Sequence, residues 1–220
     1  MTWWSLAKRI ARNTLPLCVF GGVNAFDLVR HTAIVEHGWL LSRRRGLPVD
    51  KDGAPLPWYT YSSIAFLVNR LPSDIDVFEY GCGYSTLWWM RRARSVISVE
   101  HAGPWAETIR PMANPNVRLI EVPFGQEQAY ATTIESTGKT FDVVVVDGEN
   151  RVACLKIAPH HLKSDGIVML DNSERPAYRD GILHLRNKGF RRVDFIGMGP
   201  INTYDWMTSI FYRNSNRVDL

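Results

Sequence analysis

Short apolar runs alternate with longer stretches of helical spacing from about residue 58 to the end of the chain. Residues 61–71 carry apolar side chains at helical spacing and lead into the first run. Five runs rich in β-branched residues follow, and another helical stretch separates each from the next: 76–80, 96–100, 117–122, 141–146 and 166–170. The fourth run is nearly continuous in apolar residues, as expected of a central strand covered on both faces. The alternation predicts an α/β fold with a parallel sheet and right-handed crossovers.

The last part of the chain breaks this rhythm. Residues 190–197 and 206–213 form two strand-like runs, and only the segment MGPINTYD separates them. A parallel return between neighbouring strands needs a crossover of about a dozen residues or more. The two runs are therefore expected to pair antiparallel and to close the sheet with a hairpin.

A glycine turn follows the first run, within the sequence VFEYGCGYST. Gly81 and Gly83 allow the backbone to turn sharply and to approach a ligand without a Cβ clash. Ser85 stands where the dinucleotide-binding fingerprint has its third glycine, and it is predicted to cap the next helix. A serine there leaves less room for a pyrophosphate, whereas a carboxylate or an amine would fit. A turn that binds no ligand stays open as the alternative, because glycine turns alone are weak signals.

An acidic residue, Glu100, ends the second run, and it lies about 20 positions past Gly81. An acid at this place can accept hydrogen bonds from both hydroxyls of a ribose. Proteins that bind NAD share the feature, so it predicts adenosine recognition without identifying the ligand. An ion pair between Glu100 and an arginine such as Arg94 is the alternative.

Five parallel strands closed by a hairpin, together with this turn and this acid, resemble class I S-adenosylmethionine-dependent methyltransferases over residues 58–213. The resemblance implies a Rossmann-like three-layer sandwich, whose seven-stranded, mostly parallel sheet has the order 3-2-1-4-5-7-6. It implies a methyltransferase domain at 58–220, which an N-terminal basic helical extension at 1–57 precedes. S-adenosylmethionine would be the cofactor, and Glu79 would face its methionine amino group.

Two segments, GCGYS and ISVEH, resemble the catechol and caffeoyl-CoA O-methyltransferase branch of that family. This resemblance implies that Tyr84 and Ser85 contact the cofactor and that His101 lies beside its adenosine. It also implies O-methylation of a small-molecule acceptor, at a sugar, lipid or phenolic hydroxyl.

The same branch binds a divalent cation, usually Mg²⁺, through residues that end its fourth and fifth strands. The matching residues are Asp147, Asp171 and Asn172, and neighbouring parallel strands would bring them to one edge of the sheet. The resemblance implies a metal that orients the acceptor hydroxyl, with Asp147 and Asp171 as catalytic residues. Turn formation and helix capping are the alternative roles for these residues. The lysine that serves the branch as general base is replaced by Asn150, which cannot accept a proton.

Aromatic and basic residues near the predicted site are candidates for binding the acceptor. Trp58 and Tyr61 could stack on a sugar or an aromatic ring, or they could simply cover the edge of the sheet. The guanidinium groups of Arg151 and Arg175 suit a carboxylate or a phosphate. Residues 173–178 and 199–206 occupy places where substrate loops usually lie. The basic residues form no aromatic-interleaved stripe, which disfavours nucleic acid as the acceptor.

Positive charge is concentrated near the start of the chain, where residues 1–46 carry seven basic and two acidic side chains. Residues 1–13 combine a tryptophan pair with basic residues at helical spacing, which is typical of peripheral membrane contact or of a helix packed on the domain. Residues 14–26 are apolar but too short to span a membrane, which takes about 20 apolar residues, and they only weakly imitate a signal peptide. Three widely spaced cysteines fit a reducing, cytoplasmic compartment.

Two other functions remain open from the sequence. An NAD-dependent oxidoreductase with a degenerate glycine motif is one of them, although Ser85 and the closing hairpin oppose it. The other is a non-catalytic, methyltransferase-like protein that docks on a membrane through its basic N-terminus.

Overall fold

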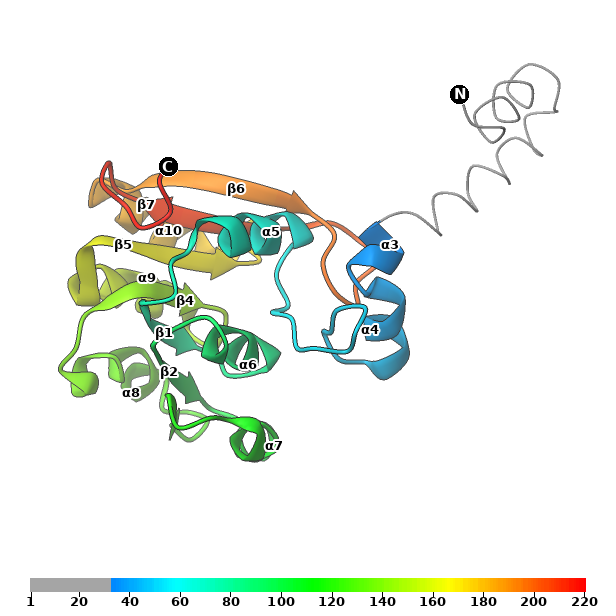
Figure 1. Cartoon of the computed structure of the whole chain (residues 1–220). Coiled ribbons are helices and arrows are strands. Elements are labelled where there is room, and N and C mark those ends of the chain that lie inside the picture. Colours follow the sequence, from blue (N-terminus) through cyan, green and yellow to red (C-terminus); the bar gives the residue numbers. More distant parts are fainter. Residues whose placement is uncertain (1–32) are drawn as a thin grey trace, which may run out of the picture.

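The protein forms one seven-stranded sheet in a computed structural model that describes residues 33–220. Residues 1–13 and 14–26, which carry the membrane-contact and signal-peptide predictions, lie outside the described residues. The strands are β1 (Asp76–Tyr80), β2 (Ser95–Glu100), β3 (Val117–Glu121), β4 (Phe141–Val146), β5 (Leu162–Asp171), β6 (Arg191–Gly197) and β7 (Trp206–Tyr212). Their order is β3-β2-β1-β4-β5-β7-β6, and β7 runs antiparallel to both of its neighbours (Figure 1). The predicted order and the closing hairpin are thus confirmed.

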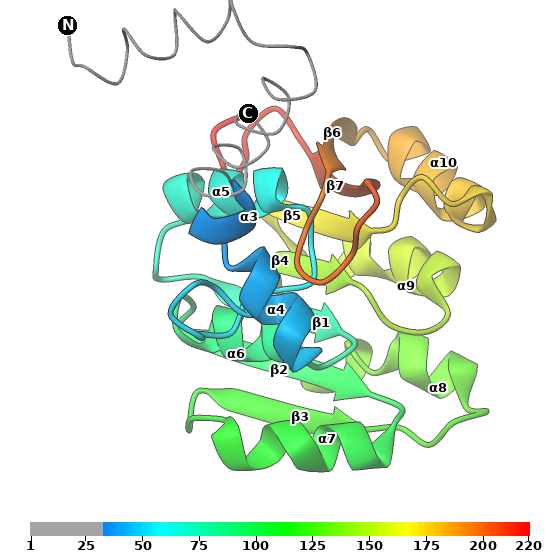
Figure 2. The same ribbon diagram turned by 90° about the vertical axis from the view of Figure 1, so that its right-hand side faces the viewer.

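Helices cover both faces of the sheet and complete the three layers. The α-helices are α3 (Ala33–Glu36), α4 (Trp39–Arg45), α5 (Tyr61–Arg70), α6 (Tyr84–Met90), α7 (Gly103–Ile109), α8 (Glu127–Thr132), α9 (Arg151–Ile157) and α10 (Arg179–Asn187). Short 3-10 turns lie at η1 (Arg110–Met112), η2 (Glu135–Thr137), η3 (Ala158–His161) and η4 (Pro176–Tyr178). Figure 2 shows α8, α9 and α10 on one side of the sheet and α5 and α6 on the other.

The core divides into two layers because successive strand residues point to opposite faces. Phe78, Val144 and Val168 pack toward α8, α9 and α10, in a cluster with Leu155 and Leu185. Their neighbours along the strands pack on the opposite face against α5 and α6: Val77, Val143, Val145, Ile167 and Met169. Trp88 and Trp89 of α6 are buried in the same cluster. All six residues of β4 are buried, which explains why its sequence is almost continuously apolar.

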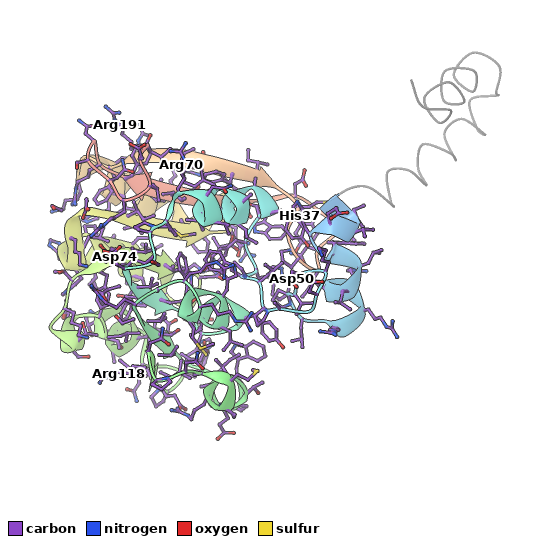
Figure 3. The ribbon with its side chains drawn as sticks, in the orientation of Figure 1. His37, Asp50, Arg70, Asp74, Arg118 and Arg191 are labelled. Atoms are coloured by element: carbon purple, nitrogen blue, oxygen red, sulfur yellow. The ribbon has the colours of Figure 1, made fainter. Side chains whose placement is uncertain are left out.

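The segment that precedes α5 and contains α3 and α4 lies across the edge at which the parallel strands end. In Figure 1 the arrows of β1 to β5 point toward α3 and α4, and in Figure 3 His37 and Asp50 mark the same edge. Asp74 and Arg191 lie at the opposite edge (Figure 3). Trp39 Nε1 donates to the Asn202 carbonyl at 2.7 Å, so α4 is tied to the connection between β6 and β7.

Two local predictions were wrong. Ser85 does not cap the helix, because α6 already begins at Tyr84 and Gly83 stands at its N-cap. Thr86 does the capping, since its Oγ1 accepts a hydrogen bond from the Gly83 amide at 3.0 Å. The fifth strand begins at Leu162, earlier than the apolar run that starts at Gly166.

Ion pairs around Asp142 stabilise the edge of the sheet opposite α3 and α4, and the loss of Asp142 should destabilise the fold. Asp142 is fully buried; its Oδ2 accepts from Lys163 Nζ at 2.6 Å, and its Oδ1 accepts from Arg217 Nε at 2.9 Å. Asp142→Ala removes a buried acceptor that Lys163, Arg217 and the Asp76 amide share, so we expect the free energy of unfolding to fall by about 3 kcal/mol in urea titrations. The exposed Asp52→Ala should stay within about 0.5 kcal/mol of the parent. Equal losses in both variants would contradict this assignment.

Candidate functional site

Two cavities meet at the carboxyl edge of the sheet. The first has a volume of about 340 Å³ and is lined by Gly46, Leu47, Pro48, Trp58, Gly81, Cys82, Gly83, Tyr84, Ser85, Glu100, His101, Trp105, Asp147, Gly148, Glu149 and Arg151. The second, of about 440 Å³, is lined by Trp58, Asp147, Arg151, Asp171, Asn172, Arg175, Asn202, Tyr204 and Trp206. Trp58, Asp147 and Arg151 line both, so they form the boundary between the two cavities.

The glycine turn at the first cavity is held by a second glycine turn behind it. Gly81 has a φ of +98°, and a Cβ there would lie 3.0 Å from the Gly148 backbone. Gly148 is itself confined, because its Cβ would come within 2.0 Å of the Tyr130 hydroxyl. The turns that follow β1 and β4 therefore pack back to back, and neither tolerates a side chain.

Glu79 lies beneath this turn and carries an unpaired polar atom. It is fully buried; its Oε2 accepts from Thr86 Oγ1 at 2.5 Å and from Ser98 Oγ at 2.9 Å, whereas Oε1 has no partner among the described residues. Burial raises the pKa of Glu79 to about 7, although the nearby Ser85 hydroxyl and the hydrogen bonds from Thr86 and Ser98 counteract the rise. A buried carboxylate oxygen without a donor is costly, and a ligand's ammonium group would satisfy it.

Glu100 lines the first cavity, and backbone amides fix its carboxylate. Its Oε2 accepts from the Cys82 amide at 2.8 Å, and its Oε1 accepts from the amides of His101 and Ala102 at 3.0 and 2.9 Å. Each carboxylate oxygen has two lone pairs, so the group still has capacity for a ligand hydroxyl. The alternative pairing with Arg94 does not occur, because Arg94 binds Asp76 instead.

Trp105 is a wall of the first cavity that the sequence pattern did not reveal. Its Nε1 donates to the Cys82 carbonyl at 2.7 Å, which fixes the indole beside Gly83. The ring is 37% exposed, a large value for a tryptophan held this firmly. Its place shortly after Glu100 was the available signal, since an aromatic ring near a ribose-binding acid can stack on a base.

The carboxylates of the second cavity are strongly perturbed. Asp171 Oδ1 accepts from Trp206 Nε1 at 3.0 Å and from Thr208 Oγ1 at 2.6 Å. Burial and then the charge of Asp147 raise the pKa of Asp171 well above its usual range. Burial likewise raises the pKa of Asp147 to about 6, although Arg151 and Arg175 oppose the rise. Perturbed carboxylates in a cavity mark a candidate reaction site.

Arg151 lies between the ends of β4 and β5, with every N–H group engaged. Its Nε donates to the Gly148 carbonyl at 2.9 Å. Nη1 donates to the Asp171 carbonyl at 2.7 Å and to Asn172 Oδ1 at 3.3 Å. Nη2 donates to the Asp147 carbonyl at 3.1 Å and pairs with Asp147 Oδ1 at 3.0 Å. A guanidinium has five donors, so none remains for an acceptor molecule.

The predicted metal ligands do come together, but the set does not fit a divalent cation. Oxygens of Asp147 and Asn172 already face the Arg151 guanidinium, and the Asp171 carboxylate is held by Trp206 and Thr208. A hard cation takes about six or more oxygen ligands, waters among them, and the fixed positive charge of Arg151 at the same place repels it. Within residues 33–220, no three His, Cys, Asp or Glu side chains gather as a metal-binding group.

The remaining predicted residues are divided between the site and other places. Arg175 lines the second cavity, and its nearest carboxylate among the described residues, Glu174, is 4.0 Å away. Tyr61 lines neither cavity, because it stacks on His37 with ring centroids 4.9 Å apart. Asn150, where the methyltransferase branch has lysine, turns away and donates to the Glu127 carbonyl.

Comparisons with solved structures identify the fold. A precorrin-6y C5,15-methyltransferase from Geobacter metallireducens has a TM-score of 0.53 at 14% identity, over 69% of this chain and 87% of that one. A precorrin 8w decarboxylase from Methanobacterium thermoautotrophicum has a TM-score of 0.53 at 17% identity, over 77% and 97%. A methyltransferase from Pyrococcus furiosus has a TM-score of 0.50 at 19% identity, over 84% and 98%.

The chain has the Rossmann-like fold of these proteins. The fold that the sequence resemblance implied is therefore confirmed, whereas these three structures do not show the catechol and caffeoyl-CoA branch. No family model matches the chain, and neither does any curated protein. From residue 33 onward, no helix has both the length and the apolar character needed to cross a membrane.

Proposed function

We propose that the protein is an S-adenosylmethionine-dependent methyltransferase that acts on an oxygen of a small molecule. One observation carries the proposal: the two cavities share a border at Asp147, Glu100 lines the first, and Glu79 is buried beside the glycine turn of that cavity. The unpaired Glu79 Oε1 suits the donor's ammonium group, and Glu100 suits its ribose. The fold supports this reading, since methyltransferases are among its structural neighbours.

The first cavity would bind the donor along the predicted residues. The backbone of Gly81 and Gly83 would approach the methionine end, with Tyr84 and Ser85 beside it. His101 lies next to Glu100, with Nδ1 3.0 Å from Oε1, and Trp105 offers a ring for the adenine. Residues 46–48 also line this cavity, so part of the segment before the proposed 58–220 domain would cover the donor.

The second cavity would bind the acceptor. Trp58 and Tyr204 are 43% and 63% exposed there, and such aromatic faces suit a sugar or phenolic ring. Arg175 could bind a carboxylate or phosphate on the same molecule, because its donors have no close partner among the described residues. The acceptor hydroxyl would then lie beside Asp147, on the border with the donor.

Methyl transfer itself is an in-line displacement. The acceptor oxygen attacks the methyl carbon, the carbon–sulfur bond breaks, and its electron pair returns to sulfur as the positive charge is lost. The acceptor proton passes to Asp147, whose second carboxylate oxygen has no protein partner among the described residues. Much of the acceleration comes from holding the three atoms in line, and no step is routed through a metal.

Donor binding separates this proposal from an NAD-dependent oxidoreductase. We expect calorimetry to give one site per chain for S-adenosylhomocysteine, with a dissociation constant in the micromolar range, and no measurable heat for NADH. Glu100→Gln should weaken S-adenosylhomocysteine about tenfold or more, since a hydrogen bond to a charged group contributes about 1.5–3 kcal/mol. A methyl-transfer assay across sugar, lipid and phenolic acceptors would then identify the substrate. Binding of NADH without binding of S-adenosylhomocysteine would contradict the methyltransferase proposal and favour the NAD-dependent oxidoreductase.

A non-catalytic protein that docks on a membrane is the weaker alternative. The perturbed carboxylates at the border of the two cavities favour catalysis over it. Peripheral membrane contact through residues 1–13 remains compatible with catalysis, and vesicle binding by the chain with and without these residues tests it.

A further inference from the structure

We infer that Arg151 is a built-in cation, which stands in this chain where a divalent metal would bind and makes methyl transfer independent of metal ions. The claim about transfer rests on the proposed function. The claim about the position of the charge does not, because it can be tested without donor or acceptor.

The guanidinium contacts the groups that a cation at this edge would contact. It reaches Asp147 Oδ1 at 3.0 Å and Asn172 Oδ1 at 3.3 Å, and it adds the carbonyl oxygens that end β4 and β5. A planar fork with five donors can satisfy oxygens that diverge from two strands, whereas a lysine could offer only a point charge. Arg151 therefore links the ends of β4 and β5 and neutralises the Asp147 carboxylate.

Local structure fixes this position. Arg151 is the first residue of α9, and Asn150 before it has a left-handed backbone with a φ of +45°. The guanidinium lies over the ring of Tyr178, with its carbon 5.3 Å from the centroid, and the side chain is only 11% exposed. A metal bound to these same oxygens would have to displace the guanidinium from four hydrogen bonds and an ion pair, which would leave the arginine buried and unpaired.

The direct test is whether removal of Arg151 creates a cation site. We would titrate the purified full-length chain with Mn²⁺, follow free Mn²⁺ by electron paramagnetic resonance, and map bound Mn²⁺ by paramagnetic broadening of amide signals. The parent should bind no stoichiometric Mn²⁺ near residues 147 and 172. Arg151→Ala should bind one Mn²⁺ there at least about tenfold more tightly, because removing one positive charge a few ångströms from a divalent ion has this effect even at the dielectric constant of water.

Matched variants separate this effect from a general change in charge. Arg192→Ala removes a comparable arginine, which pairs with Asp194 and lies over the ring of Phe211, and it should not gain the site. The double variant Arg151→Ala/Asp147→Asn should lose what the single variant gained. Arg151→Met keeps the apolar stem, and it replaces the alanine variant if that chain does not fold.

Two outcomes would overturn the inference. One is stoichiometric Mn²⁺ binding by the parent with broadening at residues 147 and 172. The other is a folded Arg151→Ala or Arg151→Met chain with no gain over Arg192→Ala. Transfer by the parent should also continue at an unchanged rate in EDTA, and loss of activity there would count against metal independence. Failure to bind S-adenosylhomocysteine would instead refute the proposed function and leave the cation result intact.

Discussion

Asp147→Asn is expected to slow methyl transfer by about 10³-fold while donor affinity stays within about twofold of the parent. Asparagine keeps an oxygen for the hydrogen bond from Arg151 Nη2 but cannot take the acceptor proton. General base catalysis contributes about 10²–10⁴-fold to such reactions. The measurement is kcat from single-turnover transfer of a labelled methyl group, with S-adenosylhomocysteine calorimetry on the same preparation.

The pH dependence provides a second readout for the same residue. Because burial raises the pKa of Asp147 to about 6, the carboxylate is ionised and able to accept a proton above that value. In the parent, kcat/KM should rise with pH and level off above a midpoint near 6, and this limb should vanish in Asp147→Asn. Glu135→Gln is the matched control, since that exposed carboxylate lines neither cavity. Equal rates for the parent and Asp147→Asn would remove Asp147 from catalysis.

Gly81→Ala is expected to abolish donor binding, with a loss of affinity of at least about 100-fold. The new Cβ would lie 3.0 Å from the Gly148 backbone, at a residue whose φ of +98° already disfavours a side chain. The strand–turn–helix that contacts the methionine end would therefore shift by more than donor recognition tolerates. Calorimetry with S-adenosylhomocysteine measures the loss, and thermal unfolding shows whether the chain still folds.

Gly125→Ala separates the close approach from backbone strain alone. Gly125 has a φ of +85°, similar to that of Gly81, but a Cβ there meets nothing within 4 Å. Both substitutions should cost about 1–2 kcal/mol of stability for the left-handed conformation, and only Gly81→Ala should lose the donor. If both variants bind S-adenosylhomocysteine like the parent, the back-to-back glycine turns do not form the donor site.

The strands could be predicted from the sequence because the fold surrounds their side chains with apolar neighbours, which favours runs of apolar residues. β4 is covered by helices on both faces, so its run of valines identifies it without knowledge of any contact. The hairpin of β6 and β7 was equally accessible, since the connection between them is too short for a crossover. The prediction that Ser85 caps the helix was wrong because Thr86 accepts the hydrogen bond from the Gly83 amide. The Thr86 hydroxyl is held in that position by its own hydrogen bond to the buried Glu79.

The acceptor side was less accessible from the sequence. Tyr61 and Trp58 are close neighbours with similar chemistry, yet Trp58 lines both cavities and Tyr61 stacks on His37. The start of α5 at Tyr61 points the two rings to different places. Trp105 reaches the first cavity from α7 and Tyr204 reaches the second from the connection between β6 and β7, and both placements depend on the packing of distant segments.

The sequence by itself determined the sheet, its closing hairpin and the edge at which Glu100, Asp147 and Asp171 emerge, because strand periodicity and parallel connections depend on local patterns. Only the tertiary structure decided how those groups are used. It paired the glycine turns of Gly81 and Gly148, and it filled the expected metal position with Arg151. Such outcomes depend on which side chains from distant segments occupy the same position in the folded structure, and residue spacing along the chain does not contain that information.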